Sequence, residues 1–259
     1  MTTSALTRPR SADLRPVVGA LAVAAGAWAL TAGRMTGMDA GPGTELGGLG
    51  WFAVTWLVMM AAMMLPALTP MVVAYNRRAR SATGSVAFGA GYLAAWLAAG
   101  LVGYGVFVAV RALDLGFLAW GDGGRYVAAG VVIAAGLYQL TGRKESFLRR
   151  CRERRAFVAR RWHAGPLGAL RMGIAHGADC VGASWALMAA LFGLGVMSLT
   201  WMAVVAVLIA AERLLPETTR WAVALALVAL GTAVAAAPGD VPGLTVPAAP
   251  QMHMQMQMR

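Results

Sequence analysis

An imidazole, a carboxylate and a thiol lie close together in one long apolar segment of the chain. Residues 166–194 are long enough to cross a bilayer, and they carry His176, Asp179 and Cys180 near their middle. At helical spacing His176 and Cys180 are one turn apart. Ionisable groups in hydrocarbon cost ~2.5–3.5 kcal/mol each, so they usually face a polar interior or a ligand. All three are metal-ligand types, so the segment predicts a metal site, with interhelical hydrogen bonding as the alternative.

Methionine is concentrated in an earlier apolar segment. Met59 and Met63 form one pair a helical turn apart, and Met60 and Met64 form a second. Thioethers are soft ligands that favour copper(I), although Met is also an ordinary filler of irregular cores. Two prolines follow and free backbone carbonyls at membrane depth, which indicates a kink beside a cavity.

The end of the chain repeats the same donor types. Met252, His253 and Met254 belong to an alternating Met-rich run. Thioethers suit copper(I) and imidazole suits copper(II), so this run resembles a metal-capturing sequence. A terminal extension without function is the alternative interpretation.

Glu212 is an acidic residue near the end of another apolar segment. It either pairs with Arg213 or Arg171 and ends the helix before a proline, or it lies at the inner mouth of a cation path.

The segments that must position these residues indicate an all-α, polytopic membrane helix bundle. Hydrophobic residues make up 59% of the 259 residues and charged residues only 13%, which is too apolar for a soluble domain of this size. Long apolar windows predict about seven transmembrane helices. The expected spans are 16–35, 51–75, 86–110, 125–141, 167–193, 196–214 and 219–237.

Basic residues predict the orientation of this bundle. The net charge is +11, and a cytoplasmic N-terminus with an outside C-terminus leaves only Arg34, Arg111, Arg125 and Arg259 outside. The basic excess therefore reflects topology and contact with anionic lipid headgroups, not nucleic-acid binding. We expect a multi-pass protein of the bacterial inner membrane. Its inner loop 141–165, which contains the basic run 143–161, is expected to begin as a helical extension and to lie at the headgroups.

The predicted topology divides the chain into three regions. Residues 1–15 are a basic cytoplasmic tail, 16–237 the membrane helical domain, and 238–259 a flexible Met- and His-containing outer tail. The two cysteines, Cys151 in the basic loop and Cys180 in the membrane, are expected to be free thiols or ligands.

Several motifs recur together in one known family. They are Trp56–Pro66, Tyr138–Thr141, Cys151-Arg152, His176–Met188, Gly195–Met202 and Glu212–Pro216. Over residues 51–216 the chain resembles an uncharacterised bacterial family labelled predicted metal-binding integral membrane proteins. The resemblance implies a metal ion as ligand and a membrane core as its site.

Two positions depart from the pattern of that family. Ala183-Ser184 stand where the family tends to have two adjacent cysteines, and Phe147 stands where it tends to have one. A site in this chain is therefore expected to use thioether and imidazole more than thiolate, which favours copper(I) over zinc.

Three hypotheses for function remain open at this point. The first is a membrane protein that binds or transports copper through a His/Cys/Met site. The second is a non-transporting scaffold or assembly factor that partners a metal-handling membrane protein. The third is an enzyme with Cys180 as nucleophile and His176 as base. The sequence has no nucleotide-binding loop and no HExxH motif, and we expect no enzyme.

Overall fold

The computed structural model describes residues 11–35, 46–113, 123–195 and 198–244. Within these ranges the chain forms nine α-helices and no β-strand, which confirms the predicted all-α class. The elements are α1 (Ser11–Met35), α2 (Leu49–Ala79), α3 (Ala82–Ala112), α4 (Arg125–Tyr138), α5 (Gly142–Arg152), α6 (Arg154–Arg160), α7 (Gly165–Leu194), α8 (Leu199–Leu214), α9 (Thr219–Ala236) and the short 3-10 helix η3 (Pro238–Asp240).

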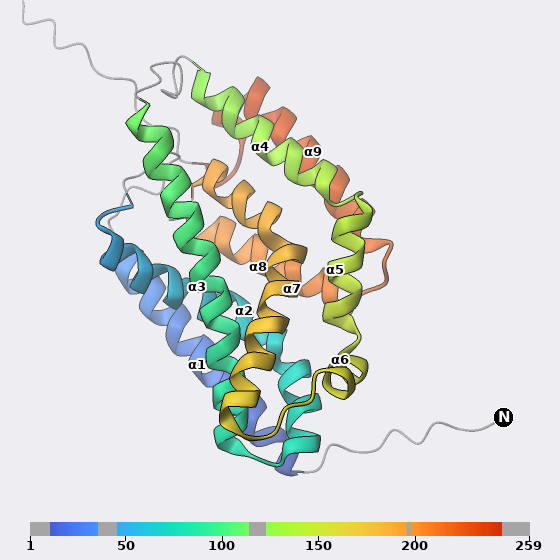
Figure 1. Ribbon diagram of the computed structural model, residues 1–259. Coiled ribbons are helices and arrows are strands. Elements are labelled where there is room, and N and C mark those ends of the chain that lie inside the picture. The colour runs from blue at the N-terminus through green and yellow to red at the C-terminus, as the bar shows by residue number, and fades with distance from the viewer. Residues whose placement is uncertain (1–10, 36–45, 114–122, 196–197, 245–259) are drawn as a thin grey trace, which may run out of the picture.

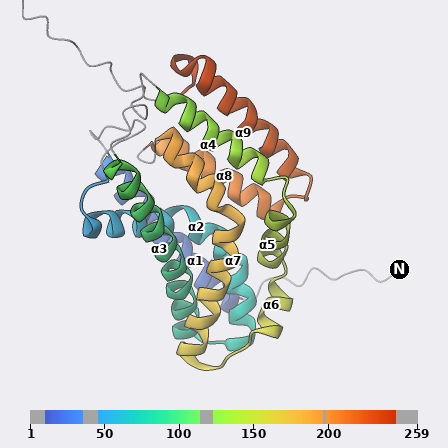
Figure 2. The same ribbon diagram turned by 45° about the horizontal axis from the view of Figure 1, so that its top comes forward.

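Helix α7 is the element around which the others are arranged. α3 lies along it, α1 lies along α2, and α4 and α9 lie side by side as a separate pair (Figures 1 and 2). α7 packs against α3, α4, α5 and α8. In the most apolar window of α7, 61% of the residues are buried, against 11% in α1 and in α3. The middle of α7 is therefore the centre of the protein.

Five helices, α1, α2, α3, α7 and α9, are long and apolar enough to cross a membrane. The predicted spans 125–141 and 196–214 are instead α4 and α8, with 14 and 16 residues. At ~1.5 Å per residue they are about 21 and 24 Å long, less than the ~30 Å hydrocarbon core of a bilayer. α4 ends early because Thr141 caps the next helix by accepting a hydrogen bond from the Lys144 amide, and α8 ends before Pro216.

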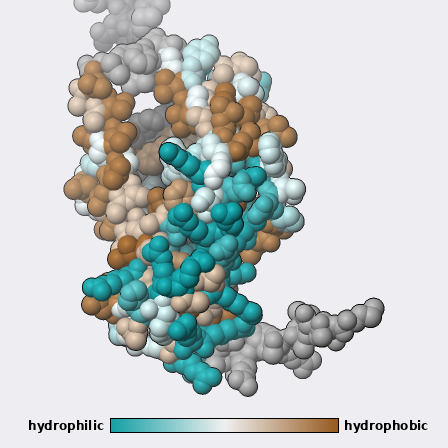
Figure 3. Space-filling view, turned by 45° about the vertical axis from the view of Figure 1, so that its right-hand side comes forward, coloured by the Kyte–Doolittle hydropathy of each residue, from teal (hydrophilic) through white to brown (hydrophobic). Residues whose placement is uncertain are grey.

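The expectation of seven helices is thus corrected to nine in the described residues. The two additional helices, α5 and α6, occupy the segment predicted as a basic loop. Figure 3 shows hydrophilic side chains as a band over these helices, with hydrophobic side chains above it. Arg149, Arg150, Arg154 and Arg155 are exposed there, while one face of α5 is buried.

The outer surface of the long helices is apolar. Large exposed hydrophobic residues include Val18, Val86, Val102, Val106 and Leu225. Contiguous exposed apolar surface is rare on soluble proteins and normal on surfaces that face lipid.

The kink expected in α2 has a local compensation. Pro70 has no amide hydrogen, so the Pro66 carbonyl loses its helical donor. The Thr69 hydroxyl donates to that carbonyl at 2.7 Å. The helix therefore continues through both prolines to Ala79.

The structure describes the first residues of the segment predicted as an outer tail, up to residue 244. η3 contacts α9, and Gly243, which follows it, lies on α8, where the Trp201 indole donates to the Gly243 carbonyl at 3.1 Å. Residues 245–259, which include Met252, His253 and Met254, lie outside the described residues.

The close contact of α3 with α7 depends on glycine. A Cβ on Gly177 would lie 2.6 Å from the Ala95 Cβ and 2.9 Å from the Tyr92 carbonyl oxygen. Small residues at such positions let helix backbones approach in membranes. We expect Gly177→Val to force the two helices apart and lower the melting temperature of detergent-purified protein by several degrees.

The control for this variant is Gly89→Val on α3, where a Cβ meets nothing within 4 Å. An equal melting temperature for Gly177→Val and the parent would contradict this description of the interface.

Candidate metal centre

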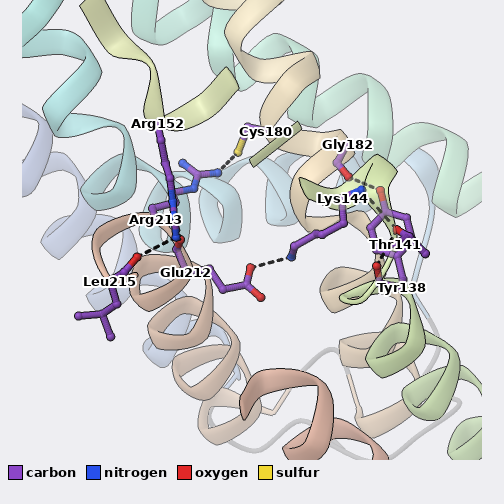
Figure 4. A network of polar contacts seen from close by, with 9 residues as sticks. All are labelled: Tyr138, Thr141, Lys144, Arg152, Cys180, Gly182, Glu212, Arg213 and Leu215. Atoms are coloured by element: carbon purple, nitrogen blue, oxygen red, sulfur yellow. Dashed lines mark hydrogen bonds and ion pairs between the residues drawn. The ribbon is translucent and has the colours of Figure 1, made fainter. Parts of the chain in front are cut away.

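Cys180 lies fully buried in the middle of α7. Its Sγ is 2.9 Å from the Tyr92 hydroxyl of α3. Arg213 of α8 donates a hydrogen bond to the same sulfur (Figure 4). The guanidinium supplies positive charge at the place where a metal-binding thiolate carries negative charge. Cys180 therefore lies in an environment suited to a thiolate ligand.

His176 is buried one helical turn before Cys180. Its ring lies among three aromatic rings, with centroid distances of 5.3 Å to Phe157, 5.9 Å to Tyr92 and 6.2 Å to Phe88. The Nδ1 atom is buried and has no hydrogen-bond partner within the described residues. A buried polar atom left unpaired costs about 1–3 kcal/mol, so this nitrogen is available to a ligand.

Asp179 faces a different helix. Its carboxylate pairs with the Arg150 guanidinium of α5 at 3.3 Å. The structure thus attaches Asp179, one of the predicted metal ligands, to α5.

The four predicted methionines of α2 are all buried: Met59, Met60, Met63 and Met64. They belong to the same apolar core as Cys180. α2 packs against α6 and α8. α6 carries Phe157, which contacts His176, and α8 carries Arg213, which contacts Cys180. The structure places the methionines and the His/Cys pair in one core, on separate helices.

A buried ion pair that the sequence analysis missed lies beside this centre. The Lys144 Nζ is 2.6 Å from a Glu212 carboxylate oxygen, and both side chains are almost completely buried (Figure 4). Glu212 was expected to pair with Arg213 or Arg171. Lys144 was not considered because it lies in a basic run.

Other polar contacts tie α5 to its neighbours. Arg152 donates to the backbone carbonyls of Glu212 and Leu215 at the end of α8. Arg220 pairs with Glu145 at 2.9 Å. α5 is therefore held against α7, α8 and α9 by polar groups.

Burial changes the acidity of two groups on α5. It lowers the pKa of Lys144, and the nearby carboxylate of Glu212 opposes that effect. Burial also raises the pKa of the Cys151 thiol to about 12, with the positive charge of Arg213 acting in the opposite direction.

Among the described residues, no three side chains of His, Cys, Asp or Glu converge as a metal-binding group. The described candidate donors are thus the buried sulfurs and one imidazole. The tail donors Met252, His253 and Met254 are outside the described residues.

A family model described as a copper chaperone, PpoB2, matches residues 53–236. The chain belongs to this copper chaperone family. Comparison with curated proteins finds no match, and comparison with solved structures finds none either.

The match to the copper chaperone family covers the predicted donors of the helical core but not those of the tail. It includes the methionines of α2, His176 and Cys180, and it ends before the Met-rich tail. Membership supports a copper-related role, in agreement with the sequence interpretation.

The sequence alone did not identify Tyr92 and Arg213, the two residues that contact the sulfur of Cys180 in this member of the copper chaperone family. Tyr92 was an aromatic residue within an apolar span, and Arg213 was considered only as a partner of Glu212. A hydroxyl at mid-span is the signal that marks Tyr92, since a buried Tyr hydroxyl usually finds a partner.

Proposed function

We propose that this protein is an integral membrane copper-binding protein that holds copper(I) in its core and passes it to a protein partner. Cys180 and His176 are the central ligands. One observation carries the proposal: the segment matched by the copper chaperone family holds a buried thiol with a guanidinium on its sulfur and an unpaired imidazole nitrogen one turn away.

The donor types are those of a soft metal. Thiolate and thioether sulfur favour copper(I), and imidazole also binds copper. The α2 methionines supply weaker sulfur donors in the same core, from which an ion can be released. Met252, His253 and Met254 collect the ion from the outer side, and Asp179 with Arg150 keeps the nearby charge balanced.

We further propose a bacterial inner-membrane location with the N-terminus inside and the C-terminus outside. The apolar exposed surface of the long helices supports lipid contact. Between α2 and α6 a groove of about 540 Å³ is lined by Arg77, Arg78, Arg154 and Arg155 over apolar residues. Such a groove suits the anionic headgroups of the inner leaflet.

Binding and transfer, not catalysis, is the proposed activity. The sulfur of Cys180 has Tyr92 and Arg213 as partners, and the ring contacts of His176 are aromatic. These contacts favour a ligand role over a nucleophile with its base.

The test is the copper content of detergent-purified protein after copper(I) loading under reducing conditions. We expect close to one copper per chain in the parent and in a form lacking residues 245–259. Cys180→Ala removes a ligand, so its affinity is expected to fall at least tenfold. Ser184→Ala, one turn further along α7 and also buried, is the matched control and is expected to bind like the parent.

Other outcomes have distinct meanings. Loss of copper only on deletion of the tail would reduce the protein to a membrane-tethered scavenger. No copper in any form would overturn the proposal and favour the scaffold hypothesis.

A further inference from the structure

Cys151 lies on the buried face of α5. Lys144, Leu148 and Cys151 are the buried residues of this helix, and their spacing of four and three residues places them on one side. The opposite side of α5 carries exposed arginines. The thiol therefore points toward the protein core from a helix that is otherwise strongly basic.

Two contacts fix this face of α5 against the middle of α7. Arg150 pairs with Asp179, and these residues directly precede Cys151 and Cys180 in the sequence. The Phe147 ring lies over Gly182, where a Cβ would approach the ring to 2.7 Å. α5 and α7 are thus held in a register that brings the segments of both cysteines together.

Arg213 lies at the end of α8, a helix that α5 contacts. It donates a hydrogen bond to Cys180. Arg152, next to Cys151, bonds to the carbonyl of Glu212, next to Arg213 (Figure 4). The end of α5 that carries Cys151 therefore lies against the turn of α8 that carries Arg213.

The buried charges of this cluster are not balanced by the protein alone. Lys144 is paired with Glu212, whereas the positive charge of Arg213 has no carboxylate partner among the described residues. Copper(I) bound by two thiolates carries one negative charge. Because unbalanced charge is costly in a buried site, a bis-thiolate copper(I) complex fits this cluster.

We propose that Cys151 is a second sulfur ligand, so that copper(I) is held between the thiolates of Cys151 and Cys180 with Arg213 as counter-charge. The inference rests on the proposed function and names the ligand set of the same site. Copper enters and leaves as copper(I), without electron transfer. Two copper–sulfur bonds form, and any proton on either thiol is released to solvent.

The experiment is a competition titration of copper(I) between a chromophoric chelator and the full-length detergent-purified protein. The variants are Cys151→Ala, Cys180→Ala and the double variant, with Ser184→Ala as control. We expect each cysteine variant to lose at least tenfold in affinity. Copper X-ray absorption should report two short copper–sulfur bonds in the parent and one in Cys151→Ala.

Parent-like affinity of Cys151→Ala, with a loss in Cys180→Ala, would overturn the second ligand and leave the proposed function intact. Parent-like affinity of both variants would overturn the core site itself. If Cys151→Ala melts at a lower temperature than the parent, Cys151→Met decides the question. This variant keeps a soft sulfur and is expected to bind more tightly than Cys151→Ala, and equal binding by the two would overturn the proposal.

Discussion

Arg213→Met is expected to lower copper(I) affinity about 100-fold while leaving the copper-free protein at least as stable as the parent. The guanidinium contacts Cys180, and no carboxylate lies within 4.0 Å of it in the described part of the chain. Its removal takes away the counter-charge of the thiolate complex, and partners of metal ligands typically contribute 10–100-fold. An apolar residue of similar length also avoids burial of an incompletely compensated cation.

Two measurements check this expectation: chelator competition for copper(I), and thermal unfolding of the copper-free protein. Arg213→Lys keeps the charge without the planar fork, so it should recover part of the affinity. A variant that binds copper as the parent does would show that Arg213 has no part in the site. A large fall in melting temperature would show that its role is structural.

Glu212→Gln is expected to destabilise the protein by about 3–5 kcal/mol, because it leaves the buried ammonium of Lys144 without its carboxylate. The double variant Lys144→Met, Glu212→Leu removes both charges and should recover most of this loss. The free energy of unfolding in mixed detergent micelles measures both effects.

The matched control is Glu145→Gln at the pair with Arg220, where the Glu145 side chain is 40% exposed. Exposed pairs contribute about 0–1 kcal/mol, so this change should have little effect. An equal loss in Glu145→Gln and Glu212→Gln would mean that burial does not determine the strength of these pairs. A double variant as unstable as Glu212→Gln would contradict the charge argument.

The helices themselves could be predicted from the sequence because apolar windows reflect the local pattern of side chains. Each of the seven predicted spans contains a helix, yet α4 and α8 are short. Window length does not show where a cap such as Thr141 ends one helix and begins the next. The inner loop was predicted to begin as a helical extension, but the positions of α5 and α6 depend on contacts distant in sequence.

The residues of the candidate site likewise include some that the sequence predicts and others that only tertiary packing brings together. His176 and Cys180 were predicted because they are close in sequence on one helix. Tyr92, Lys144 and Arg213 come from three other helices, and their meeting depends on tertiary packing. The departure at Phe147 indicated fewer thiolates, whereas the fold brings the segments of Cys151 and Cys180 together.

Helix α5 joins the interior of the protein to its surface. Its inner face carries Cys151, and its outer face forms part of the hydrophilic band in Figure 3. Cys180, in contrast, is held by contacts from α3 and α8. With the proposed ligands, a partner that binds the outer face of α5 and displaces this helix removes one sulfur while the other stays in place. The metal then leaves in a fixed order, with Cys151 as the first bond to break and Cys180 as the last.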